Sequence, residues 1–323
     1  MRVALLVLIC CVGFGRHAIG QQITNTSFYM FNKFQFNPAV AGSDDDISLF
    51  SSVRRQWVRI QEAPVMQSLA SHAYVGSHIG VGANFFNDAA GPSRRTGLSV
   101  SAARHFQISK GNETWFSLGL SGNLFQYAFD EEKLRFDQPG DPVLGTAATS
   151  RMVPDAAFGA FFYGEQFDVG FSVQNLIQAR INLFDIENQI NNQMMRHYYL
   201  TGTYDFFINE EFTITSSALV KYVVGAPVQA DATVLFHFLN MFYAGPGFRS
   251  MDAIYILAGV DYGKVSFGYA FDYTYNTLRS YNAGTHEIYV ALRLNNALKK
   301  DGGHHSGFNG RRKPNYQQRN RRR

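Results

Sequence analysis

The side chains able to carry catalysis or to bind a metal are spread along the chain without a spacing typical of either role. Five histidines fall singly, far from the paired spacing that a zinc site needs: His72, His78, His105, His237 and His286. No Gly-x-Ser-x-Gly sequence is present, and His286 is followed by Glu287 and Ile288 rather than by a nucleophile. The sequence therefore predicts no catalytic residue, no metal site and no cofactor, in a chain that is not an enzyme.

Three consecutive aspartates, Asp44 to Asp46, raise the alternative of a calcium loop. Calcium takes about six or more oxygen ligands, supplied by alternating residues around a glycine turn. Consecutive side chains point in different directions, so the sequence favours a solvated turn.

Residues 1–20 have the features of a secretory signal peptide. Arg2 gives a positive start, Val3 to Phe14 form an apolar stretch, and Ala18-Ile19-Gly20 supply small residues where a signal peptidase cleaves. We therefore expect the mature chain to begin at Gln21. Both cysteines lie inside the apolar stretch, so the mature chain has neither a disulfide nor a thiolate metal site.

The composition of the rest leaves two fold classes open. No run after Gln21 approaches the roughly 18 apolar residues that a membrane helix needs. Yet 46% of the residues are hydrophobic and 15% are aromatic. A soluble fold would bury these aromatic residues in a core, whereas a membrane β-barrel would place many of them against lipid.

The dominant pattern is alternation of apolar with small or polar residues, which a strand with two different faces requires. It is clearest in Phe116 to Leu124, Phe167 to Val173, Val265 to Tyr273 and His286 to Leu294. In a membrane barrel the apolar face meets lipid and the polar face lines the lumen.

The length of the alternating segments decides between the two classes. We expect about fourteen strands, near residues 46–57, 63–75, 78–88, 95–108, 114–127, 153–163, 166–175, 197–208, 211–223, 228–238, 240–249, 253–261, 263–275 and 284–295. Most have ten to thirteen residues. Soluble strands average about five or six, but a tilted membrane strand needs about nine to eleven. The sequence thus predicts an all-β, antiparallel, up-and-down transmembrane barrel over residues 21–295.

The connections alternate in length. Every second one is a short turn, at residues 76–77, 109–113, 164–165, 209–210, 239 and 262, and most of the others are longer: 88–94, 128–152, 176–196, 224–227 and 276–283. Bacterial barrels have short periplasmic turns and longer outer loops. We therefore expect an outer-membrane protein with both termini periplasmic, whose long outer loops 128–152 and 176–196 are candidate partner-binding segments.

Charged residues on the strands should point inward or lie at the rims, because a charge facing lipid costs about 2–4 kcal/mol at mid-membrane. Several arginines and aspartates could line the lumen: Arg54, Arg55, Arg59, Arg94, Arg95, Arg104, Arg293, Asp155, Asp168, Asp231 and Asp272. An interior ion-pair network is favoured over a selective pore.

The segment Asn37-Pro38-Ala39-Val40-Ala41-Gly42 comes before the first strand. Pro38 fixes its own φ and restricts Asn37, while Gly42 permits a positive φ. These residues suit a plain turn or a segment packed in or under the barrel. The second is favoured, because a barrel of this size leaves a lumen to be filled.

The tail, residues 296–323, has nine basic residues against one acid, or +8, whereas residues 21–295 carry 18 basic and 24 acidic residues, or −6. The tail is expected to be disordered and periplasmic. Its candidate binding residues are Arg311, Arg312, Lys313, Arg321, Arg322 and Arg323. An acidic periplasmic subunit, anionic lipid headgroups or peptidoglycan would suit it, and a solvated tail without a partner stays open. Nucleic acid is not expected.

Several short motifs lie in order between residues 28 and 295: Asn37-Pro38-Ala39-Val40-Ala41-Gly42, Arg55-Gln56-Trp57, Asn87-Asp88 with Gly91-Pro92, Pro154-Asp155, Asp272, and His286-Glu287. In this order the sequence resembles the PorP/SprF-like outer-membrane proteins of the Bacteroidetes type IX secretion and gliding machinery. The tail departs from that pattern.

The resemblance implies a non-enzymatic barrel that helps a large secreted adhesin reach the cell surface or stay attached to it. Its expected partners are the lipid bilayer, the secreted cargo on the outer side, and subunits of the secretion machinery in the periplasm. The alternative is a small solute channel, a porin, and the two differ in whether the lumen is filled.

Overall fold

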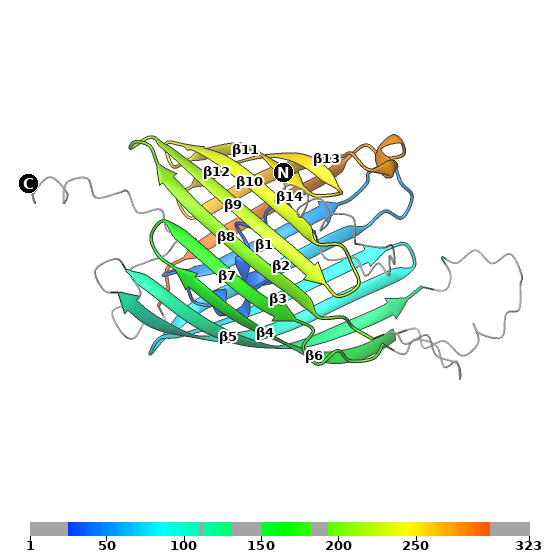
Figure 1. The fold of residues 1–323 in the computed structure, drawn as a ribbon, viewed down its shortest axis with the longest axis horizontal. Coiled ribbons are helices and arrows are strands. Elements are labelled where there is room, and N and C mark those ends of the chain that lie inside the picture. Colours follow the sequence, from blue (N-terminus) through cyan, green and yellow to red (C-terminus); the bar gives the residue numbers. More distant parts are fainter. Residues whose placement is uncertain (1–24, 110–112, 131–132, 134–149, 182–192, 298–323) are drawn as a thin grey trace, which may run out of the picture.

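The fold is a closed barrel of fourteen antiparallel strands in a computed structural model that describes residues 25–109, 113–130, 133, 150–181 and 193–297. Each strand pairs with its neighbours in the chain, and β1 pairs with β14 to close the barrel (Figure 1). The strands are β1 (Ile47–Arg55), β2 (Val65–Gly76), β3 (Ile79–Ala90), β4 (Ser93–Ser109), β5 (Thr114–Phe129), β6 (Ser150–Tyr163), β7 (Phe167–Gln174), β8 (His197–Phe207), β9 (Phe212–Val223), β10 (Gln229–Phe238), β11 (Phe242–Arg249), β12 (Ala253–Tyr262), β13 (Val265–Thr274) and β14 (Thr285–Leu294).

This architecture confirms the predicted all-β up-and-down barrel, and each expected strand is present within about three residues of its predicted bounds. The helical elements named in the described residues are short 3-10 turns: η1 (Lys33–Gln35), η2 (Pro38–Val40) and η5 (Thr277–Ser280). No helix in the described part of the chain is long and apolar enough to cross a membrane.

The two faces of the wall differ as the alternation predicted. On β5, Leu118 and Leu120 are exposed on the outside, whereas Trp115 and Ser117 are buried inside. β13 repeats the pattern, with Phe267 outside and Ser266 inside. The outer surface is therefore apolar, which suits a lipid solvent. The inner wall combines polar side chains with apolar ones that pack around the N-terminal segment.

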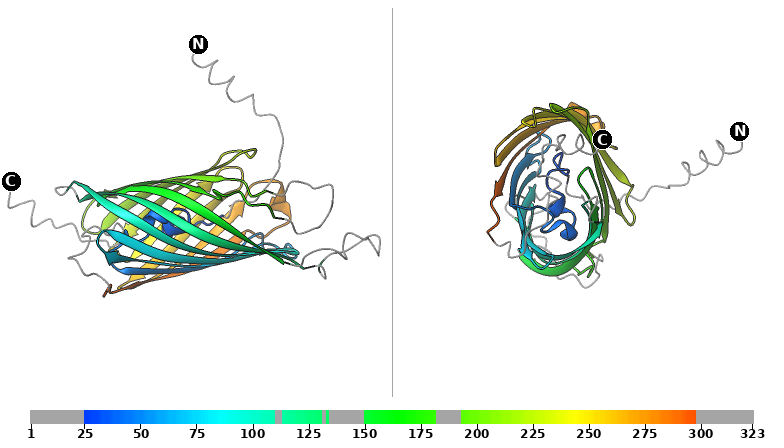
Figure 2. Two further views of the ribbon diagram at one scale, coloured as in Figure 1. Left: turned by 90° about the horizontal axis from the view of Figure 1, so that it is seen from below. Right: turned by 90° about the vertical axis from the view of Figure 1, so that its left-hand side faces the viewer.

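The lumen is filled by the N-terminal residues 25–43, which we call the plug. The plug forms η1 and η2 and lies inside the barrel when the structure is viewed along its axis (Figure 2). Its apolar side chains pack against the inner wall, and Phe28 and Ala39 are fully buried. The prediction that an N-terminal segment packs in or under the barrel is confirmed, and its position is inside.

The two barrel ends differ in their connections. At one end, the short-turn end, each connection has two to four residues: 77–78, 110–113, 164–166, 208–211, 239–241 and 263–264. At the other, the long-connection end, they are 56–64, 91–92, 130–149, 175–196, 224–228, 250–252 and 275–284.

One predicted long connection is wrong. Residues 88–94 were expected to form a loop, but β3 and β4 continue as a paired hairpin through Ala90 and Ser93. Only Gly91 and Pro92 remain as the turn, with Gly91 at φ +57°. Turn-forming residue types close to the hairpin tip made the loop look longer than it is.

The first and last described residues lie at opposite ends. Asn25 is bonded to Lys221, near the long-connection end of β9, whereas Asn296 is bonded to Tyr74, near the short-turn end of β2. The expectation of two termini on one side therefore does not fit the described ends of the chain. The terminal residues themselves lie outside the described residues, as do the expected signal peptide, most of loops 128–152 and 176–196, and the basic tail from residue 298.

Candidate functional site in the barrel lumen

Six charged side chains meet inside the wall near the long-connection end. We call them the lumen cluster: Arg54 on β1, Lys221 on β9, Asp231 on β10, Arg249 on β11, Asp272 on β13 and Glu287 on β14. Arg249 is central, with Nε 2.6 Å from Asp231 Oδ1 and Nη1 2.9 Å from Asp272 Oδ2. Three cations face three carboxylates, and a fourth carboxylate, Asp252, lies 3.4 Å from Arg249 Nη1 at the edge of the cluster.

The remaining members complete the network. Arg54 lies 2.7 Å from Asp272 and 3.0 Å from Glu287, and Lys221 lies 3.0 Å from Asp231. All of these side chains are almost completely buried. Buried charges are tolerated only when they are paired and hydrogen-bonded, so each member depends on the others.

The first residues of the plug are bonded into this cluster. Ser27 donates from its hydroxyl to Asp272 at 2.7 Å and from its backbone N–H to Glu287 at 2.8 Å. The Thr26 hydroxyl donates to Glu287, and the Thr26 carbonyl accepts from Arg249 at 3.1 Å. The cluster thus ties the plug to strands from both sides of the β1–β14 seam.

Further along, two polar plug side chains reach the opposite wall. The Tyr29 hydroxyl donates to the Ser217 carbonyl at 2.9 Å. Lys33 forms a buried ion pair with Asp168 on β7. These contacts fix the middle of the plug against β7 and β9.

The motif Asn37 to Gly42 forms the turn that ends the plug. Asn37 caps η2, with its Oδ1 accepting from the Ala39 N–H at 2.9 Å, and its Nδ2 donates to the Ala160 carbonyl of β6 at 2.9 Å. Pro38 is the first residue of η2, where its missing N–H costs nothing. Gly42 has φ +76°, a conformation that favours glycine.

Glycines in the wall allow the plug backbone to approach this closely. A Cβ added at Gly80 would lie 1.9 Å from the Ala41 oxygen, and one at Gly159 would lie 1.9 Å from Asn37 Oδ1. One at Gly119 would lie 2.4 Å from a plug backbone nitrogen. The wall of β3, β5 and β6 therefore has a surface shaped to fit the motif.

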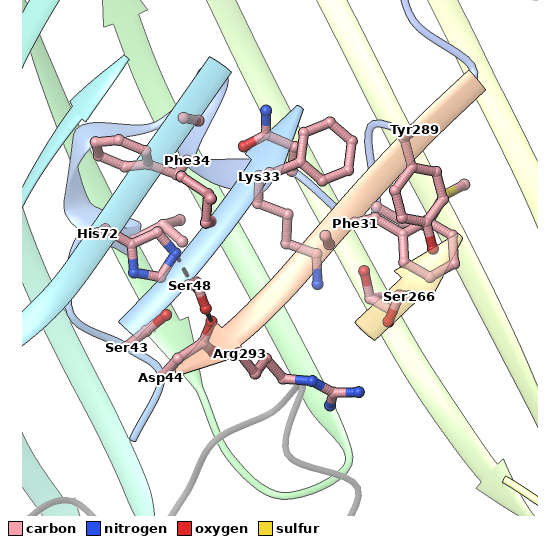
Figure 3. Close-up of a pocket in the computed structure, with 18 of the residues that line it drawn as sticks. Phe31, Lys33, Phe34, Ser43, Asp44, Ser48, His72, Ser266, Tyr289 and Arg293 are labelled. Atoms are coloured by element: carbon pink, nitrogen blue, oxygen red, sulfur yellow. Dashed lines mark hydrogen bonds and ion pairs between the residues drawn. The ribbon is translucent and has the colours of Figure 1, made fainter. Parts of the chain in front are cut away.

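Between the plug and the short-turn end the lumen keeps a cavity of ≈ 120 Å³ (Figure 3). Phe31 and Lys33 line it from the plug, and Tyr289 lines it from β14. At its edge, Asp44 accepts a hydrogen bond from Ser48 and lies 3.7 Å from His72 Nε2. The space suits a small group of waters.

The predicted motif residues fall into three places. Asn37, Pro38 and Gly42 belong to the plug, and Asp272 and Glu287 belong to the lumen cluster. The remaining ones lie near the long-connection end: Arg55, Trp57, Asn87, Asp88, Gly91, Pro92, Asp155 and His286.

The motif residues of the long-connection end act through local contacts. Arg55 and His286 are neighbours in the β1–β14 register and face outward. Asn87 accepts from Arg94 at 2.8 Å, and Asp155 accepts backbone N–H bonds from Ala156 and Ile177. Trp57 donates from its backbone to the Thr285 hydroxyl at 3.1 Å. Two of these contacts fix the connections at this end, residues 56–64 and 175–196, to the ends of β14 and β6.

The sequence singled out Arg54 and the four aspartates as lumen residues, and all five are buried inside. Arg55, Arg94 and Arg104, in contrast, are exposed on the outside. Lys33, Lys221 and Arg249 were missed. For the two residues on strands, the alternation could have indicated an inward side chain. Lys221 lies two positions after the inward-facing Leu219 on β9, and Arg249 ends β11, whose odd-numbered residues face the lumen.

What this arrangement can do chemically is to hold a segment in place by ion pairs and hydrogen bonds. In the described residues no group of three or more His, Cys, Asp or Glu side chains is placed to hold a metal ion.

A family model described as "Type IX secretion system membrane protein PorP/SprF" matches residues 18–292 of this chain. A search of curated proteins finds no match.

Three solved structures illustrate what the chain is similar to in shape. The Pseudomonas putida toluene transporter TodX has 10% identity, with 82% of this chain and 93% of that chain covered and a TM-score of 0.48. The Ralstonia pickettii toluene transporter TbuX has 10% identity, coverages of 81% and 93%, and a TM-score of 0.47. The Acinetobacter baumannii outer membrane protein Omp33 has 8% identity, coverages of 78% and 100%, and a TM-score of 0.42. Such similarity assigns no ligand to this chain.

Proposed function

Because the chain belongs to the PorP/SprF family of type IX secretion system membrane proteins, we propose that this outer-membrane barrel supports the export or surface anchoring of a large secreted adhesin-type cargo. The proposed role is that of a non-enzymatic docking protein. It does not require solute to pass through the lumen.

The observation that carries this proposal is the buried plug. Its first residues are bonded to the lumen cluster, and its last residues fit against wall glycines. A segment held at both ends by buried contacts is expected to stay in the lumen. The surfaces left for a partner are then the rims.

We propose that the long-connection end faces the cell exterior and receives the cargo, since outer loops of bacterial barrels are the longer ones. Exposed arginines gather there: Arg55, Arg59, Arg94, Arg151, Arg196 and Arg279. Loops 128–152 and 176–196 emerge at the same end. An acidic face on the cargo would complement this rim.

At the other end, acidic residues predominate, including Asp45, Asp46, Glu165, Glu210 and Glu211. We propose that this end faces the periplasm and the secretion machinery. The basic tail that follows Ala297 would extend on this side, where an acidic machinery subunit, anionic lipid headgroups or peptidoglycan could bind it.

Conductance in planar lipid bilayers tests the docking role against the porin alternative. The purified full-length protein should show no stable open-channel current, because the plug occupies the lumen. A variant with Thr26→Ala and Ser27→Ala, which removes two hydroxyl bonds to the lumen cluster but keeps the plug in the chain, should show more frequent channel openings at the same protein amount. A steady current through the intact barrel would favour a solute channel and contradict the docking role.

A further inference from the structure

A second cavity, of ≈ 60 Å³, lies between the plug and the wall toward the long-connection end. Its floor includes Phe36 and Pro38 of the plug. Its wall is mainly polar and comes from β3, β4, β5, β7 and β8: Asn84, Ser99, Ser101, Ser121, Asn123, Gln174 and His197. The volume is enough for a few waters or for the end of one extended side chain.

Arg95 lines this cavity from β4. Its guanidinium lies 5.2, 4.6 and 5.5 Å from the ring centres of Phe86, Phe125 and Tyr127. It forms no direct ion pair with a carboxylate of the described residues, although Asp88, its register partner on β3, and Asp155 on β6 are close enough to interact with it electrostatically. Every cation of the lumen cluster, in contrast, has at least one carboxylate within 3.0 Å.

Three polar atoms of side chains that line this cavity are buried without a hydrogen-bond partner among the described residues: Arg95 Nε, Asn84 Oδ1 and His197 Nε2. Asn84 and His197 are each 7% exposed. Buried polar groups are normally satisfied, and each one left unpaired costs roughly 1–3 kcal/mol. Here a guanidinium surrounded by aromatic rings lies beside unpaired hydrogen-bond donors and acceptors. Such an arrangement can bind an anion together with the polar groups that accompany it.

We propose that this cavity is a binding site for a carboxylate group that enters from the long-connection end. The carboxylate would pair with the planar Arg95 fork, whose geometry matches it. The aromatic rings hold the guanidinium in position, the His197 Nε2–H can donate to the carboxylate, and Asn84 Oδ1 can accept from a water that accompanies it. Arg95 is partly exposed, so the site is reachable from outside. The carboxylate can belong to a free small acid or to an acidic side chain of an extended peptide.

The test is binding of ¹³C-succinate to the purified full-length barrel, followed by line broadening in NMR. Succinate should bind the unchanged protein, and Arg95→Gln should weaken binding by about tenfold or more. Asn84→Asp, which keeps Arg95 but adds a carboxylate to the cavity, should also block it. Arg104→Gln is the matched control, since Arg104 lies on the same strand, faces outward and donates to the exposed Ser77 carbonyl instead of lining the cavity. Heat-dependent gel mobility checks that each variant is folded.

A second arm separates the two sources of the carboxylate. The capped peptides acetyl-Gly-Glu-Gly-amide and acetyl-Gly-Gln-Gly-amide are titrated in the same way. If the Glu peptide binds in competition with succinate and the Gln peptide does not bind, the site is assigned to acidic side chains. Binding of succinate without either peptide assigns it to free acids. The proposal is overturned if neither succinate nor the Glu peptide binds, or if folded Arg95→Gln binds as well as Arg104→Gln.

Discussion

At the scale of single residues, close approach between backbones explains why glycine recurs in the lumen wall. Gly119 and Gly122 lie three residues apart on β5, but only Gly119 faces the plug, whereas nothing lies within 4 Å of a Cβ at Gly122. Alternation places Gly119 on the lumen face with Ser117 and Gly122 on the outer face with Leu120, but the sequence alone could not show that a backbone lies against Gly119. Their difference depends on a segment some 80 positions earlier in the chain.

Gly119→Val should therefore destabilise the barrel, by about 1–3 kcal/mol if the plug stays in place, because the new side chain overlaps the plug backbone. Gly122→Val should change stability by less than about 0.5 kcal/mol. Urea unfolding followed by heat-dependent gel mobility measures both. Equal midpoints for the two variants would show that the plug does not fit against the wall as described.

The lumen cluster gives a second prediction at this scale. Arg249→Gln leaves Asp231 and Asp272 short of a partner in a buried site, and breaking such a pair costs about 3–5 kcal/mol. Arg279→Gln is the control, since Arg279 lies in η5, is exposed and lies over the Tyr273 ring. The urea midpoint should fall sharply for the first variant and stay nearly unchanged for the second. The result would be contradicted if the two midpoints agree.

At the scale of elements, strands were predictable because their signal is local. Alternation and segment length can be recognised within ten to thirteen consecutive residues, and these two features predicted all fourteen strands. The β3–β4 turn was mispredicted because turn-forming residues such as Asn87 sit inside the ladder there. The partners of Arg249 were unpredictable for another reason: they come from β10, β13 and the plug, and no pattern within one strand encodes that register.

The connections at the long-connection end carry the docking prediction. Loops 128–152 and 176–196 differ in how their described residues lie. Ile181 and Met194 pack onto Phe125 and Val153 inside the mouth, whereas Arg151 is exposed. Replacing residues 134–149 with a short Gly-Ser linker should keep the barrel folded and reduce cargo retention at the cell surface. Immunoblotting of whole cells and culture supernatant measures retention.

Replacing residues 182–192 in the same way is the parallel experiment, because it spares the buried stem. If cargo stays on the surface after both replacements, docking occurs elsewhere, and the periplasmic end becomes the favoured surface.

At the scale of the whole molecule, the plug crosses the barrel from the long-connection end to the short-turn end before β1 begins. In the orientation that we propose, with the long connections outside, Asn25 would lie at the cell surface and Ala297 at the periplasmic side. Sequence patterns gave no hint of this direction, because a segment entering from either end would show the same residues. The direction is revealed only by the hydrogen bonds that residues 25 to 27 make with side chains near the ends of strands.

An epitope inserted directly before Asn25 should therefore be stained by antibody on intact cells. The same epitope placed after Ala297 should be stained only after the outer membrane is permeabilised. A periplasmic protein serves as the control for intact membranes. Staining of the C-terminal epitope alone on intact cells would invert the orientation, and staining of neither would place both ends inside.

The crossing plug also dictates an order of assembly. A finished barrel sealed by β1 and β14 offers no route for eighteen or so residues with bulky aromatic side chains to be drawn through a packed lumen. The plug must be in place while the sheet is still open, and the seam must close around it. Ser27 bonds Asp272 and Glu287 on one side of that seam, and Arg54 bonds the same carboxylates from the other side. The N-terminal residues therefore act as an internal template, so a chain synthesised without them would lose the guide that brings its first and last strands together.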